Sequence, residues 1–127
     1  MYLRNYLILL IFFVLGCEKA PDEEYPVREE PSFERIDLEE LAGEGNAEAQ
    51  FRLAEHLLKG PLQDRNETKG ILWLRFAAEQ GLASAQYELG ESFLSGIGVR
   101  KNKNEAIRWL NRAADQGQPM AQNVLGW

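Results

Sequence analysis

The sequence predicts an all-α protein, a short α/α solenoid built from antiparallel helix pairs. One phrase occurs three times: "LAGEGNAEAQFRLA" at 41–54, "AAEQGLASAQYELG" at 77–90 and "AADQGQPMAQNVLG" at 113–126. The copies are 36 residues apart and align without an insertion. A fixed period in this range is typical of repeat architectures, in which each unit buries its apolar face against its neighbours.

Each full unit is predicted to contain two helices. In the second unit, five apolar residues recur at the spacing of a helix with one buried face. These residues are Ala106, Trp109, Leu110, Ala113 and Ala114. Asn102 is expected to cap this helix, with Glu105 completing a capping box, and Gly117 stands where a left-handed C-cap belongs.

The remaining helices follow from the same register. A helix from about 82 to 95 precedes the one just described, and the first unit repeats the pair near 46–59 and 67–80. Small residues at Ala77 and Ala113 are expected to let helices approach closely, while Trp73 and Trp109 fill the space between them. The glutamines that recur in every copy of the phrase are predicted to be structural: Gln50, Gln86 and Gln122.

The stretch "AQYELGESFLSGIGVRKNKNEAIRWLNRAADQG", residues 85–117, resembles the Sel-one-like repeat (SLR), a relative of the tetratricopeptide repeat. The residues on the family pattern are Ala85, Gln86, Leu89, Gly90, Gly96, Gly98, Val99, Ala106, Trp109, Ala113, Ala114 and Gly117. The first unit departs from the pattern in its loop, "GPLQ" at 60–63, and it has Gly70 where the second unit has Ala106. The resemblance implies a solenoid whose relatives bind other proteins, and it implies no catalytic activity.

The chain is expected to have six parts. These are a lipoprotein signal peptide (1–16), an acidic proline-containing linker (17–31), a capping helix (32–44), two repeats (45–80 and 81–116) and a half-repeat (117–127). In the capping helix, Asp37 stands where Trp73 would be, which suits the polar outer face of a terminal unit. At the other end, Val124, Leu125 and Trp127 are expected to pack against the helix of Trp109, or to leave an apolar end that docks a partner or a second copy.

The N-terminal segment predicts that the protein is located at a membrane. An apolar run, "NYLILLIFFVLG", follows Arg4 and is shorter than the roughly 20 residues that cross a bilayer. Val14-Leu15-Gly16-Cys17 resembles the lipobox of bacterial lipoproteins, which implies lipid attachment, including palmitate, at Cys17. We therefore expect a lipid-anchored protein facing the periplasm, with the outer membrane favoured because Glu18 follows the cysteine; an uncleaved anchor and an ordinary signal are the alternatives.

Charge and composition exclude several classes of function. From Glu18 to Glu44 there are eleven acidic and three basic residues, whereas from Gly45 to Trp127 there are nine acidic and ten basic residues. A nucleic-acid binder needs a sustained positive face, so this class is not expected. One cysteine excludes an intramolecular disulfide and a multi-cysteine metal site. We expect no cofactor, no metal and no small-molecule substrate.

The expected partner is another protein, bound on the first helix of each pair. In solenoids of the resembling family these helices line the concave face, and positions that differ between repeats are free to serve recognition. The candidate residues are Glu48, Arg52, His56, Lys59, Ser84, Glu88, Ser92 and Ser95; a merely solvated helix face is the alternative. The basic segment at 100–103 is expected to be an exposed loop, with contact to anionic lipid or a partner as its alternative.

Three functions are compatible with these observations. The first is an envelope-anchored protein-interaction module, in a sharper form an immunity protein against a secreted toxin. The second is an envelope-assembly adaptor or scaffold lipoprotein. A weak hydrolase using His56 and Ser92 is the remote alternative, because no oxyanion site accompanies them, and we expect that the protein is not an enzyme.

Overall fold

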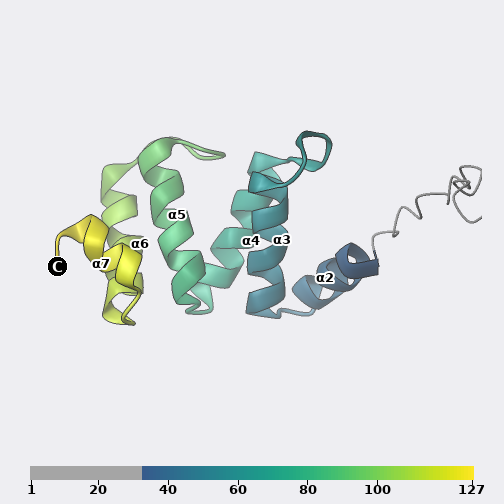
Figure 1. Ribbon diagram of the computed structural model, residues 1–127, viewed down its shortest axis with the longest axis horizontal. Coiled ribbons are helices and arrows are strands. Elements are labelled where there is room, and N and C mark those ends of the chain that lie inside the picture. The colour runs from purple at the N-terminus through teal and green to yellow at the C-terminus, as the bar shows by residue number, and fades with distance from the viewer. Residues whose placement is uncertain (1–32) are drawn as a thin grey trace, which may run out of the picture. The chain divides into compact units, whose positions relative to one another are not determined.

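The computed structural model describes residues 33–127, with side chains from Asp37 onward, and these residues form one compact unit. This part of the chain contains α-helices, one short 3-10 helix and no strand, which confirms the predicted all-α fold. The elements are α2 (Phe33–Gly43), α3 (Ala47–Lys59), η1 (Leu62–Asp64), α4 (Glu67–Glu79), α5 (Ala83–Ser95), α6 (Lys103–Asp115) and α7 (Pro119–Leu125) (Figure 1).

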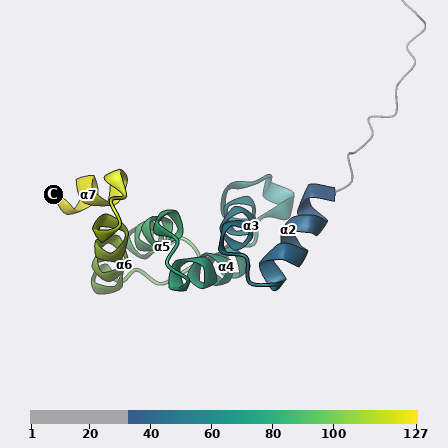
Figure 2. The same ribbon diagram turned by 90° about the horizontal axis from the view of Figure 1, so that it is seen from below.

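The helices form two layers. Figure 2 shows α3, α5 and α7 on one side, with α4 and α6 on the other. We call these the first-helix layer and the second-helix layer. The helix pairs α3–α4 and α5–α6 make the most extensive contacts, and α4–α5 contacts join the two repeats. Each predicted helix is found within about two residues of its expected bounds, because the 36-residue register places the caps as well as the apolar face.

Asparagine side chains begin three of the helices. Asn46 accepts from the backbone N–H of Ala49 at 2.9 Å, and Asn102 from that of Glu105 at 3.1 Å. The predicted capping box at α6 is wrong in its second half. The backbone N–H of Asn102 donates to Phe93 O at 2.9 Å, and the Glu105 carboxylate turns along the helix to Arg108 at 2.6 Å.

The two repeats differ in the loop between their helices, as the sequence suggested. In the second repeat Gly96 ends α5 with φ of 78°, the left-handed conformation that glycine adopts without strain. In the first repeat Gly60 has φ of −68° and is extended, and Pro61 then leads into η1. The substitution of "GPLQ" for the family loop therefore exchanges a left-handed turn for a 3-10 turn.

The core is mostly leucine and alanine from both layers, together with Ile71, Phe93 and Trp109. Leu53, Leu74, Leu89 and Leu110 are the largest fully buried side chains. The alanines at 77, 78, 113 and 114 are at most 1% exposed, which confirms that small residues mediate the close contacts between helices. Trp109 is buried, whereas Trp73 is partly buried and packs against core residues on both sides of it.

The recurring glutamines are structural, as predicted. Gln50, Gln86 and Gln122 each donate from Nε2 to a backbone carbonyl eight residues earlier, at 3.0, 3.1 and 3.0 Å. Each bond links a first helix to the end of the helix before it. Gln50 and Gln86 are buried, and each adds a second hydrogen bond to a helix-end carbonyl that also accepts from the backbone N–H of Gly45 or Gly81.

The terminal helices are less covered than the repeats between them. In α2, Ala42 is buried, but Leu41 is 43% exposed although its equivalents, Ala77 and Ala113, are buried. In α7, Leu125 packs on the core as expected. The expected packing of Val124 and Trp127 is wrong: they are 47% and 65% exposed, because no helix of the described residues covers the outer side of α7.

Candidate partner-binding surface

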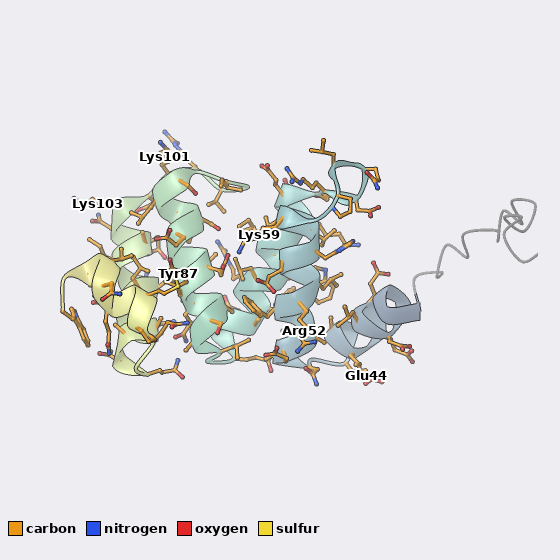
Figure 3. All side chains as sticks on the ribbon, in the orientation of Figure 1. Glu44, Arg52, Lys59, Tyr87, Lys101 and Lys103 are labelled. Atoms are coloured by element: carbon orange, nitrogen blue, oxygen red, sulfur yellow. The ribbon has the colours of Figure 1, made fainter. Side chains whose placement is uncertain are left out.

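The first-helix layer brings several of the predicted binding residues together. On α3, Glu48 and Arg52 form an exposed ion pair one helical turn apart, at 3.2 Å. Lys59 extends from the end of α3 to α5, where its ammonium lies 2.6 Å from Glu88 (Figure 3). Lys59 is also 3.9 Å from Glu55 on its own helix. The candidate stripes of the two repeats therefore meet at an ion pair between helices.

Sequence reasoning missed three residues at this meeting point. Glu55, Tyr87 and Glu91 lie around the Lys59–Glu88 contact, and we call these five residues the Lys59 cluster. Burial raises the pKa of the Tyr87 phenol, and the charges of Glu91 and Glu88 raise it further. Glu55 and Glu91 occupy equivalent positions in the two repeats. Glu55 and Glu91 were missed because only positions that differ between repeats were considered as binding residues.

The Lys59 cluster carries more negative than positive charge. It contains three carboxylates and one ammonium: Glu55 and Glu88 approach Lys59, whereas Glu91 lies near Tyr87 and has no ion pair within the described residues. Tyr87 contributes an aromatic ring that packs against the core beneath α7. The cluster thus combines a partly buried ring with an excess of carboxylates over ammonium groups, a combination suited to a cationic side chain of a partner.

Two predicted residues stand apart from the Lys59 cluster. Ser92 is only 7% exposed, and its hydroxyl donates to Glu88 O at 2.9 Å within the helix. His56 faces the η1 loop, with its Nε2 atom 3.7 Å from Asp64 Oδ2. Ser92 is a correction to the predicted stripe, because it is buried although it lies one turn from Glu88. His56 is half-buried beside the η1 loop, and its binding of a partner stays a prediction.

The remaining two serines have modest roles in the structure. Ser95 is exposed and donates to Glu91 O at 2.9 Å, and Ser84 is half-buried in the first turn of α5. For these serines and for Glu48, Arg52, Lys59 and Glu88, partner binding stays a prediction.

The hydrolase alternative gains no support from the geometry. The hydroxyl of Ser92 is committed to a backbone carbonyl, and the Nε2 atom of His56 lies against the η1 loop. No hydrogen bond joins the two side chains within the described residues. In the same residues, no group of three or more His, Cys, Asp or Glu side chains is placed to hold a metal ion.

The basic segment at 100–103 forms an exposed connection between α5 and α6, as expected. Lys101 and Lys103 project from this end of the second repeat (Figure 3). The predicted lipidation at Cys17, the signal peptide and the acidic linker lie outside the described residues. Among the helices described, none has the length and apolarity needed to cross a bilayer.

Comparison with known proteins identifies the repeats. The family model of the Sel1 repeat matches residues 47–82 and 83–118, two residues later than the unit boundaries expected from the sequence. A Sel1 repeat protein from Oxalobacter formigenes is 31% identical, with a TM-score of 0.70 over 72% of this chain and 70% of that one. No curated protein gives a significant match.

A second solved structure is similar over a smaller share of its length. It is a protective antigen, with an SLR fold, present in uropathogenic Escherichia coli strains. The identity is 32% and the TM-score 0.69, over 72% of this chain. The match covers 20% of that chain, about one fifth of its length.

Proposed function

This chain belongs to the Sel1 repeat family, and we propose that it is an envelope-anchored module that binds another protein through its first-helix layer. Repeats of this family generally mediate protein–protein interactions. The assignment of the binding surface rests on the Lys59 cluster, where side chains from both repeats meet and carboxylates outnumber the single ammonium. The chemistry of the cluster favours a partner segment that presents lysine or arginine.

The proposed anchor is a lipid on Cys17. The cysteine follows an apolar run, and at least two acyl chains on it would hold the protein firmly at a membrane. With the outer membrane favoured, the repeats would face the periplasm. Labelled palmitate should be incorporated into the wild-type chain and not into Cys17→Ser; incorporation into both would refute the assignment of Cys17.

Within this proposal the sharper role is that of an immunity protein. The Lys59 cluster joins side chains of both repeats in one charged surface, which suits one dedicated partner such as a secreted toxin. The second candidate is an envelope-assembly adaptor. Purifying the protein together with its bound partners from detergent-solubilised envelopes separates the two roles. One stoichiometric toxin-like partner supports immunity, and several envelope proteins support an adaptor.

The binding surface is tested in the same recovery experiment with two charge-reversal variants. Glu91→Lys changes the Lys59 cluster and should reduce partner recovery at least about tenfold. Asp115→Lys makes a similar change on an exposed site of the second-helix layer and should leave recovery unchanged. If both variants recover the partner as well as the wild type does, the first-helix layer is not the binding surface.

A further inference from the structure

A stripe of four side chains on α4 lies on the outside of the second-helix layer. Lys69, Leu72, Phe76 and Glu79 follow one another at intervals of three, four and three residues, and this spacing puts them on one face of a helix. Leu72 and Phe76 are 52% and 50% exposed, and Lys69 and Glu79 are exposed at the two ends. We call these residues the outer stripe.

The outer stripe is complementary to itself when reversed. Leu72 and Phe76 are each two residues from Leu74, and Lys69 and Glu79 are each five residues from it. Two copies of α4 packed antiparallel about Leu74 therefore place Leu72 against Phe76 of the other copy, and Lys69 against its Glu79. We propose that a second copy of this chain occupies the outer stripe and forms a two-fold symmetric dimer.

The second repeat shows why the contact is centred on α4. The equivalent positions on α6 are Glu105, Arg108, Arg112 and Asp115. The same antiparallel arrangement would oppose arginine to arginine and carboxylate to carboxylate. On α6 these side chains are also used within the repeat: Arg108 contacts Glu105 at 2.6 Å, and the Arg112 guanidinium lies 4.7 Å from the centre of the Trp109 ring.

The first repeat replaces this arginine with an aromatic side chain. Phe76 meets Trp73 edge to face, with ring centres 5.8 Å apart and an interplanar angle of 62°. Residue 76 thus keeps a contact with the tryptophan of its repeat, but the surface that it presents outward becomes apolar. Burying Leu72 and Phe76 of both copies removes four large apolar side chains from water, which favours association.

The charged ends of the outer stripe are available for the partner copy. Lys69 approaches Glu39 of α2 only at 4.0 Å, with both side chains about half exposed. Such a pair contributes little and can exchange for a better one. Glu79 has no ion pair among the described residues. The dimer would use the second-helix layer and leave the first-helix layer free, so it is independent of the proposed partner binding.

The test is sedimentation equilibrium of the full chain in a density-matched detergent. The wild type should show a reversible monomer–dimer equilibrium. Phe76→Arg, which installs the residue that the second repeat has at this position, should weaken the dimer at least about tenfold. Ile107→Arg is the matched control, since Ile107 is an exposed apolar residue on α6, and it should leave the dimer intact.

Reversal of the end charges tests the register. Lys69→Glu and Glu79→Lys should each weaken the dimer, and the two together should restore it. The two positions are about 15 Å apart along one helix, so rescue requires contact between copies. A monomer throughout the micromolar range, a dimer unaffected by Phe76→Arg, or a failure of rescue would overturn the proposal. If the wild type is monomeric and a different protein is recovered with it from envelopes but not with Phe76→Arg, that protein occupies the outer stripe and the dimer proposal is overturned.

Discussion

Gln116 donates a hydrogen bond from its side-chain Nε2 atom to Oε1 of Gln86 at 2.8 Å, and Gln86 donates in turn to Ala78 O at 3.1 Å. The same relation occurs one repeat earlier, where Gln80 donates to Gln50 at 2.7 Å. Gln86 therefore connects the end of α4, the start of α5 and the end of α6. Because the Gln86 amide both donates and accepts, its nitrogen and its oxygen each have a partner in this polar bridge across the repeat boundary.

Replacing Gln86 by alanine should destabilise the protein by about 1 kcal/mol, because Ala78 O and the Gln116 amide each lose one hydrogen bond and keep another, from the Gly81 N–H and to Gly81 O respectively. Urea denaturation measures the change. Gln63→Ala, in the exposed η1 turn, is the control and should change stability by less than about 0.5 kcal/mol. Equal effects of the two substitutions would contradict a structural role for the bridge.

The sequence was sufficient to predict a structural role for the glutamines of the recurring phrase, but not the second side chain to which two of them bind. Residues repeated identically at one helical position indicate a shared structural task, and Gln50, Gln86 and Gln122 fit that expectation. Gln80 and Gln116 stand just beyond the helices of their repeats. Their side-chain partners depend on how successive repeats pack, which a periodicity argument does not supply.

The surface residues were harder to predict for a related reason. A helix pattern gives the face on which a residue lies but not how neighbouring elements cover that face, so it placed the buried Ser92 and the half-buried His56 on an exposed face. It also hid the outer stripe, because Leu72 and Phe76 fit the apolar pattern of a buried helix as well as that of an interface. The family resemblance covers the shared framework and leaves these differing positions unassigned.

The close contact between α5 and α6 at Gly90 gives a second prediction. A Cβ atom at this position would lie 2.7 Å from Leu110 Cγ and 3.2 Å from Ala106 O. Leu110 is buried and has little room to move, so Gly90→Ala should destabilise the protein by about 1 kcal/mol despite its gain in helix propensity. Thermal and urea denaturation measure this change.

Gly43→Ala provides the comparison for Gly90→Ala. Gly43 ends α2, and a Cβ atom there would meet nothing within 4 Å. This variant should be neutral or slightly more stable. The first repeat has Ala54 where the second has Gly90, and Gly70 where the second has Ala106. Ala106→Gly added to Gly90→Ala reproduces the first repeat's pair, and a total loss as large as the two single losses combined would exclude any compensation between the two sites.

The environment of Tyr87 predicts a loss of stability at alkaline pH. Burial and the neighbouring Glu91 and Glu88 carboxylates raise the pKa of this phenol above its usual value near 10. Between that value and the folded pKa, the unfolded chain releases the proton and the folded chain keeps it. The free energy of unfolding should therefore fall as pH rises above about 10, while this contribution is fully present at lower pH.

Tyr87→Phe isolates that effect. Phenolate absorbance of the variant, subtracted from that of the wild type, gives the titration of Tyr87 apart from the other tyrosines. The variant should lose less stability than the wild type between pH 9 and pH 11. A difference titration centred at or below pH 10 would contradict the raised pKa. A bound partner cation beside Glu91 should move the same titration to lower pH, since it offsets the carboxylates.

The structural role of the Lys59–Glu88 contact can be measured separately from its role in partner binding. The pair joins α3 to α5, but the Lys59 side chain is 55% exposed and that of Glu88 is 23% exposed, so solvent weakens the attraction. A double-mutant cycle with Lys59→Ala and Glu88→Ala should give a coupling free energy of about 0.5–1 kcal/mol, reduced by added salt. The Glu48–Arg52 pair, within one helix, should give about 0.3 kcal/mol in the same measurement.

If Glu88 serves the partner as well as the fold, Glu88→Ala should lower partner recovery far more than this small stability change can explain. Unchanged recovery with the expected coupling would limit the pair to holding the two repeats together.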